Sequence, residues 1–221
     1  MTTNELNTFG KFIGLSNIVI AKVLKNTTTE FTTDTPMYLA DSLSIKYTPK
    51  YDSQTFYGNN IAKQVMSSFK ESDIEVKVAT LPLDRIALLL GKTVDKNGTV
   101  IDTANDIAPT FSLGYRSEKS DGTAELTWVY CVTFADPVSS YASKTDKMKG
   151  QDITIKATAL SREKDNRIRV RNGEKDFVDK GITTAKDILD TWFAKVYEPD
   201  GILAPVMPIP PIPVNTEKPT A

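Results

Sequence analysis

The sequence predicts a mostly-β protein, a β-sandwich or barrel with one short flanking helix and a further helix near the C-terminus. Three observations predict this class. Alternating apolar and polar residues recur from residue 15 to residue 171, helical spacing of apolar residues occurs in only two segments, and turn-forming residues separate successive strands. A chain of 221 residues can bury a substantial core. We expect one β domain over residues 1–198, followed by a proline-rich arm over residues 199–221.

The first three strands are expected over residues 15–24, 42–47 and 74–78. Ile and Val lie on both faces of the first segment, which is typical of a strand buried from both sides. The other two segments alternate apolar and polar side chains, so we expect them to be half-buried. The 25 residues from Thr48 to Ser72 are then the connection between the second and third strands. This connection is far longer than the usual length of about 4–6 residues, which is typical of a functional or mobile segment.

A short helix and a tight hairpin follow the third strand. Pro82 suits the first position of a helix, and Gly91 ends a run of apolar residues at helical spacing. The Asn97-Gly98 pair between two valines favours a hairpin with a type I′ turn, because both residue types accept positive φ angles.

Four more strands are expected over residues 110–116, 125–134, 152–159 and 167–171. The second of them has the strongest alternating pattern and places five apolar residues on one face. These residues are Leu126, Trp128, Tyr130, Val132 and Phe134.

The second helix is expected over residues 185–196. Thr184 is a suitable N-cap, and Asp187 stands three residues later as in a capping box. The apolar stripe of this helix consists of Ile188, Leu189, Trp192, Phe193 and Val196.

The composition excludes several classes of function. The chain has 27 Lys and Arg against 28 Asp and Glu, so it lacks the basic excess typical of a duplex-DNA-binding domain. It contains no histidine, which removes the commonest general base and metal ligand and with them most hydrolase triads and zinc sites. The N-terminus lacks a signal-peptide pattern and the longest apolar run is five residues, so we expect no targeting segment and no membrane anchor.

Three candidate sites have simpler structural interpretations. The run Asp95-Lys96-Asn97-Gly98 lacks the third acidic ligand and the final glutamate of a calcium loop, which favours a plain turn. Ser161 and Lys164 have Ser-x-x-Lys spacing, but within polar loop sequence rather than at a strand-to-helix turn. Cys131 is expected to be a buried, inert thiol in mid-strand. We therefore predict no catalytic residue, no cofactor and no metal.

Arg167, Arg169 and Arg171 are spaced by two, which places their guanidinium groups on one face of the last strand. They could form a solvated edge that resists aggregation or a subunit contact with carboxylates of a neighbour. Nucleic-acid binding ranks third, because no aromatic residue is interleaved with the arginines to stack on bases.

Several short structural motifs follow one another along residues 10–198. They are Gly14-Leu15-Ser16-Asn17-Ile18, Ser44-Ile45-Lys46, Ile74-Glu75-Val76-Lys77-Val78-Ala79, Leu81-Pro82-Leu83 with Leu89-Leu90-Gly91, and Ala108-Pro109 through Leu113-Gly114-Tyr115-Arg116-Ser117-Glu118 to Trp128-Val129-Tyr130. In order and spacing, the sequence resembles the major tail proteins, or tail tube proteins, of long-tailed non-contractile bacteriophages.

The resemblance implies a structural protein of the virion tail, assembled in the cytoplasm of the host bacterium. In that family six β-sandwich protomers close into a ring, and rings stack into a tube around a tape-measure protein. The tube later conducts DNA into the host cell. The near-neutral charge suits such a conduit, because phosphate contacts would retain the DNA.

The resemblance also implies that the long connection reaches the adjacent ring. The expected inter-ring contact residues are Thr48, Tyr51, Phe56, Tyr57, Ile61, Val65 and Ser72.

The arm over residues 199–221 holds seven of the twelve prolines and is therefore expected to be extended. Its apolar side chains favour docking along a neighbouring subunit or ring, and the alternative is a disordered tail. The expected contacts are Val206, Met207, Ile209 and Ile212.

Two other functions remain open from the sequence. A carbohydrate- or surface-binding β-sandwich module would need exposed aromatic residues, whereas most aromatic residues here fall on expected core faces. A glycosidase-like enzyme is disfavoured because no acidic residue lies in an aromatic-rich segment that would bind sugar.

Overall fold

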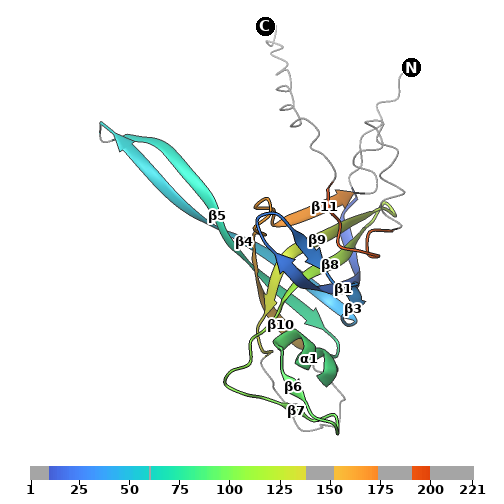
Figure 1. Ribbon diagram of the computed structural model, residues 1–221. Coiled ribbons are helices and arrows are strands. Elements are labelled where there is room, and N and C mark those ends of the chain that lie inside the picture. Colours follow the sequence, from blue (N-terminus) through green and yellow to red (C-terminus); the bar gives the residue numbers. More distant parts are fainter. Residues whose placement is uncertain (1–9, 60, 138–151, 174–190, 200–221) are drawn as a thin grey trace, which may run out of the picture.

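The computed structural model describes residues 10–59, 61–137, 152–173 and 191–199, and this part of the chain is mostly β, as predicted (Figure 1). The strands and the helix are β1 (Phe12–Asn26), β2 (Phe31–Thr33), β3 (Met37–Tyr38), β4 (Ser42–Gly58), β5 (Ile61–Val78), α1 (Leu83–Leu90), β6 (Thr93–Val94), β7 (Val100–Ile101), β8 (Thr110–Lys119), β9 (Ala124–Phe134), β10 (Ile153–Leu160) and β11 (Arg169–Gly173). All pairings among them are antiparallel.

The main sheet has the strand order β2-β1-β8-β9-β10-β5-β4, with β3 also paired to β1 and β11 to β9. Two strands share one edge of β9: β10 pairs with its residues 131–134 and β11 with its residues 125–129. The sheet therefore divides at β9, and the β10-β5-β4 part curls back toward β1. Leu15 of β1 and Ile45 of β4 consequently line the same groove, although their strands stand far apart in the strand order.

The curl encloses the larger of two hydrophobic clusters. Ile18, Ile20, Ile74, Val76 and Leu113 are among its members and have at most 1% of their surface exposed. They come from β1, β5 and β8, so apolar positions of these three strands meet inside the curl.

The smaller cluster lies on the other face of the sheet, beneath residues 191–199. Trp128 and Tyr130 of β9 pack there with Trp192 and Val196. The Trp128 indole N–H donates a hydrogen bond to the Trp192 carbonyl oxygen at 2.9 Å, and the Tyr130 hydroxyl donates one to the Tyr197 carbonyl oxygen at 2.9 Å. Both faces of the β1–β8–β9 region are therefore covered, which explains why β1 is apolar on both sides.

A β-bulge in β9 corrects one prediction from the sequence. Leu126, Trp128 and Tyr130 face the smaller cluster, whereas Val132 and Phe134 belong to the larger cluster on the opposite face. The pairing with β8 advances by two residues from Phe111 to Leu113 while β9 advances by three. The extra residue reverses the alternation, so the five residues do not share one face.

Helix α1 and the β6–β7 hairpin form as predicted, with two differences in detail. Pro82 is the N-cap of α1 rather than its first helical residue, and Gly91 ends the helix in the left-handed conformation with φ of 68°. In the hairpin turn only Gly98 has a positive φ, of 81°. The turn is therefore not of type I′. Asp95 Oδ1 instead accepts hydrogen bonds from the backbone N–H groups of Asn97 and Thr99, both at 2.8 Å.

The predicted C-terminal helix lies largely outside the described residues. Of its described residues, only Thr191 has helical geometry, and residues 192–195 form a turn and a bend. The helix therefore ends before Val196, where the sequence predicted its last residue. Trp192 and Val196 are nevertheless buried, as predicted from the apolar stripe. The arm residues Val206, Met207, Ile209 and Ile212 also lie outside the described residues.

Candidate interaction surface

Strands β4 and β5 continue far beyond the main sheet as a two-stranded ribbon (Figure 1). Their pairing runs from Ser42 opposite Val78 to Gly58 opposite Ile61. Strand β10 covers only residues 72–78 of β5. We call residues 50–71, which extend past β10, the projecting hairpin. The segment predicted as a connection between two short strands is thus the extension of both strands.

The projecting hairpin exposes large apolar side chains along its length. Those with at least 43% of their surface exposed are Tyr51, Phe56, Tyr57, Ile61, Val65 and Met66. The first five were expected as contact residues from the sequence, and Met66 was missed although it lies opposite Gln54 in the same ribbon.

Two residues expected on this surface lie instead at the base of the ribbon. Ser72 is fully buried, and its hydroxyl donates a hydrogen bond to the Tyr47 hydroxyl at 2.6 Å. Ser72 therefore cannot form part of an exposed contact surface. Thr48 is exposed, but it pairs with Asp73 within the part of β5 that β10 covers.

Both faces of the projecting hairpin carry apolar side chains. Residues directly opposite each other in an antiparallel pair point to the same face. Tyr51 therefore shares a face with Phe69, and their rings meet edge to face with centroids 5.9 Å apart. The next residue along β4, Asp52, points to the other face, which also carries Phe56 and Met66. Among the described residues, no core covers either face.

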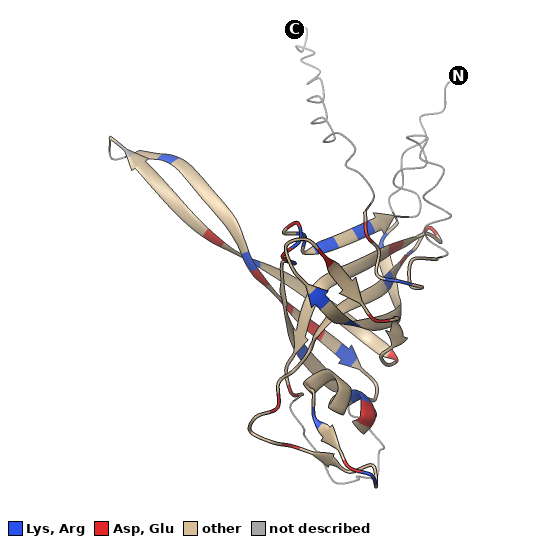
Figure 2. Ribbon diagram, viewed as in Figure 1, with Lys and Arg blue, Asp and Glu red and all other residues tan. Residues whose placement is uncertain are grey.

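Charge is concentrated at the base of the hairpin and is nearly absent from its tip (Figure 2). The Lys50 ammonium lies 2.8 Å from Asp73 and 3.0 Å from Glu71, and these contacts raise its pKa. Lys63 is the one charged residue among residues 53–67. The outer edge of β4 has no partner strand in the described part of the chain. A ribbon with few charges toward its tip, exposed apolar side chains and an open edge is suited to binding another protein surface.

Each of the three arginines predicted as a possible subunit contact interacts with another residue of the same chain. Arg167 lies outside β11 and pairs with Asp165 at 3.2 Å, and Arg171 lies 3.6 Å from Glu125. The Arg169 guanidinium stacks over the Tyr47 ring, 4.2 Å from its centroid, and so joins β11 to β4 across the curl. A contact of these arginines with a neighbour's carboxylates stays a prediction.

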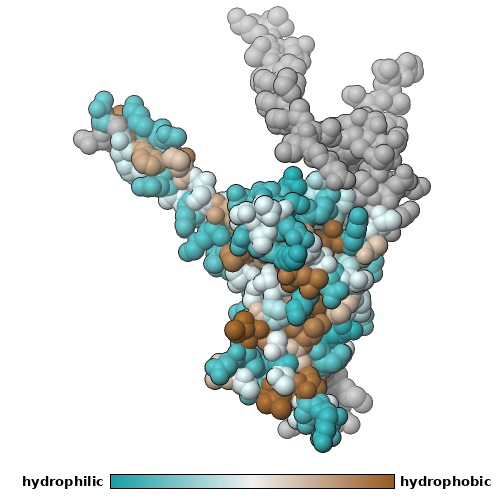
Figure 3. Space-filling view, in the orientation of Figure 1, coloured by the Kyte–Doolittle hydropathy of each residue, from teal (hydrophilic) through white to brown (hydrophobic). Residues whose placement is uncertain are grey.

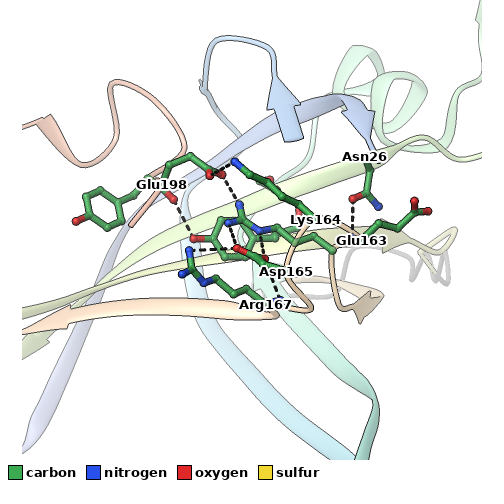
Figure 4. A network of polar contacts seen from close by, with 10 residues as sticks. Asn26, Glu163, Lys164, Asp165, Arg167 and Glu198 are labelled. Carbon is green, nitrogen blue, oxygen red and sulfur yellow. Dashed lines mark hydrogen bonds and ion pairs between the residues drawn. The ribbon is translucent and has the colours of Figure 1, made fainter. Parts of the chain in front are cut away.

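Among the described residues, the most deeply buried charge is Arg162, which the sequence did not single out. Its two acidic partners, Asp165 and Glu198, lie in the network of polar contacts that Figure 4 shows. Its side chain is fully buried, donates two hydrogen bonds of 2.7 Å to Asp165 and also pairs with Glu198. The guanidinium lies 4.2 Å from the Tyr130 ring centroid and 5.0 Å from that of Phe31. Nothing in the local pattern predicts this, because Glu198 is 36 residues away in the chain.

The remaining candidate sites have structural roles. Burial raises the pKa of the Cys131 thiol to about 11, and the thiol is buried as predicted. The Lys164 ammonium pairs with Glu198 at 3.1 Å. Within residues 10–59, 61–137, 152–173 and 191–199, no group of three Cys, Asp or Glu is placed to hold a metal ion. No helix in this part of the chain is long and apolar enough to cross a membrane.

No protein-family model matches this chain, and no curated protein matches it significantly.

Proposed function

We propose that this protein is a structural subunit that assembles with copies of itself, and that the projecting hairpin is its main contact with the next layer of the assembly. The observation that carries this proposal is the group of six exposed apolar side chains on a ribbon without a core. Burying such side chains against a partner removes apolar surface from water, which favours association. An isolated two-stranded ribbon is only marginally stable in water, so a partner surface would stabilise both the ribbon and the assembly.

The proposed assembly is a phage tail tube. Hexameric rings would stack around a tape-measure protein and form the conduit for DNA delivery, with the projecting hairpin bridging adjacent rings. The hexamer and the virion role rest on the resemblance of the sequence to tail tube proteins. Gly114, one of the motif residues that carry the resemblance, lies opposite Trp128 in the pairing of β8 with β9. A Cβ atom at Gly114 would lie 2.9 Å from the Trp128 ring, so this position requires glycine.

The experiment that tests the proposal shortens the hairpin without disturbing its base. Replacing residues 53–67 with Asn-Gly leaves Asp52 opposite Ser68 and closes the ribbon with a two-residue turn. A matched control, Leu24→Ser with Leu160→Ser, removes two exposed apolar side chains elsewhere. Negative-stain microscopy and light scattering of the purified proteins should show rings or tubes for the wild type and the control.

The shortened variant should remain folded but form no stacks, because it has lost the contact between layers. Tubes of normal length from the shortened variant would overturn the role of the hairpin. A wild-type protein that stays monomeric at all concentrations would overturn the assembly proposal and favour the surface-binding module.

A further inference from the structure

A second exposed apolar surface lies at the other end of β5. The N-terminal end of β5 is the tip of the projecting hairpin, and its C-terminal end leads directly into α1. We call residues 83–109, which contain α1, β6 and β7, the end lobe. Figure 1 shows α1, β6 and β7 together at the bottom of the molecule, with the hairpin projecting away from them.

The end lobe exposes four large apolar side chains. These are Leu83, Val94, Ile101 and Ile107, and Ile107 has 84% of its surface exposed. Figure 3 shows strongly hydrophobic residues at the surface of this end of the molecule. Exposed apolar side chains gathered at one end of a domain are typical of a site of protein contact.

Close backbone contacts and ion pairs also hold the end lobe in one conformation. The backbone at Gly91 passes so close to the Ile107 carbonyl that a side chain there would overlap it. The Lys92 ammonium, nearly buried, pairs with Asp102 at 2.8 Å and with Asp136 at 2.9 Å. Hydrogen bonds to these two carboxylates raise the pKa of Lys92, so its ammonium group is charged throughout the neutral pH range. The lobe therefore presents its apolar side chains in a preformed arrangement.

We propose that the end lobe is the surface on which the projecting hairpin of a second copy docks. This inference rests on the proposed function and names the partner surface of the hairpin. The two surfaces match in polarity, since each is apolar and exposed in the single chain. They also match in charge. Lys63 gives the segment 53–67 a charge of +1, whereas the end lobe has three basic and four acidic residues and a net charge of −1.

A second match lies in the main chain. The β6–β7 sheet has two strands, and in the described part of the chain neither pairs with a third. The projecting hairpin likewise has open strand edges beyond β10. Main-chain hydrogen bonds between two open edges can add to the apolar contact.

Docking of the hairpin on the end lobe predicts an assembly that can grow beyond two layers. A hairpin that docks on a different surface of the next copy forms a heterologous contact, and such contacts repeat into open stacks. A hairpin that docks on another hairpin forms an isologous contact, which closes after two layers. A tube needs the first kind.

Mixing two complementary variants tests this. The hairpin variant carries Tyr57→Asp and Ile61→Asp, and the lobe variant carries Val94→Asp and Ile107→Asp. All four side chains are at least 48% exposed, so the substitutions remove little core packing. Neither variant alone should stack. A 1:1 mixture should form a species of twice the mass of the unstacked form and nothing longer, because only one intact hairpin–lobe contact is available.

The control and the outcomes separate the two proposals. The control variant carries Leu24→Asp and Leu160→Asp, exposed positions outside both surfaces, and should stack like the wild type. If the lobe variant stacks normally, or if the mixture fails to pair while both variants are folded by circular dichroism, the docking surface is wrong and the hairpin keeps its proposed role. If the hairpin variant stacks normally, the proposed function itself fails.

A cross-linking measurement covers the case in which an aspartate variant does not fold. A chain with Tyr57→Cys and Ile107→Cys should give a reducible ladder of multimers under mild oxidation, since the buried Cys131 does not compete. Tyr57→Cys paired with Leu24→Cys should give no ladder. A ladder of equal strength from both chains would overturn the proposed contact. A disulfide-linked dimer from a chain with Tyr57→Cys alone would also overturn it, because that dimer would place two hairpins against each other.

Discussion

The Arg162 guanidinium joins three parts of the chain that are distant in sequence. It contacts the rings of Phe31 and Tyr130 and the carboxylates of Asp165 and Glu198. Removing a guanidinium group from water is unfavourable by several kcal/mol, and these four partners offset that penalty together. Because Glu198 belongs to the segment that covers the smaller cluster, Arg162 fastens that segment to the sheet.

Replacing Arg162 with Met should destabilise the fold by about 3–5 kcal/mol, because the substitution leaves carboxylates without their buried partner. Urea unfolding followed by tryptophan fluorescence measures this, since Trp192 belongs to the same segment and packs in the smaller cluster with Trp128. The matched control is Arg167→Met, which breaks a more exposed pair with the same Asp165 and should change the free energy of unfolding by less than about 1 kcal/mol. Equal effects of the two substitutions would contradict the role given to Arg162.

At the scale of elements, the strands with a covered face were predictable and the ribbon was not. Period-2 alternation identified β9 and β10, and a run of residues apolar on both faces identified β1, because their apolar positions face a core. In the projecting hairpin no core selects one face, so polar residues such as Ser53 and Ser67 stand between the aromatic ones and the alternation is weak. The bulge in β9 was equally hidden, since each residue from Trp128 to Val132 is buried on one side or the other.

Two glycines with positive φ, Gly91 at the end of α1 and Gly98 in the β6–β7 turn, should differ in how strongly an alanine substitution destabilises the fold. Gly91 and Gly98 both have positive φ, so an alanine at either position is unfavourable by about 1–2 kcal/mol. A Cβ atom at Gly91 would also overlap the Ile107 carbonyl, whereas one at Gly98 meets nothing within 4 Å. Gly91→Ala should therefore lower the melting temperature clearly more than Gly98→Ala in thermal unfolding. Similar shifts would show that the helix end tolerates displacement from residue 107.

At the scale of the whole molecule, the sequence led to a mostly-β class but not to spatial relations. The curl of the sheet depends on the division at β9 and on contacts such as Arg169 over Tyr47, which link positions more than a hundred residues apart. Of the candidate surface, the sequence supplied most of the exposed residues of the hairpin. It did not predict that these residues lie on a two-stranded ribbon, nor that the hairpin and the end lobe lie at opposite ends of β5, since both follow from tertiary geometry.

Truncation after Pro199 tests the predicted arm while keeping Glu198 and its contact with Arg162. If residues 200–221 dock on a neighbouring subunit, the truncated protein should still assemble, but its tubes should dissociate at a lower temperature or urea concentration. Light scattering during a temperature ramp measures this, with the full-length chain as the reference. Unchanged tube stability would favour a tail without a docking role.

The length of β5 has a mechanical consequence for any assembly built through its two ends. A paired, extended strand can hardly be stretched, and 18 residues at about 3.3 Å each give a span of about 60 Å. The strand therefore acts as a ruler between the hairpin tip and the end lobe. In the proposed assembly, the number of residues along this one strand would set the axial spacing between successive layers, whereas core substitutions elsewhere would change stability without changing that spacing.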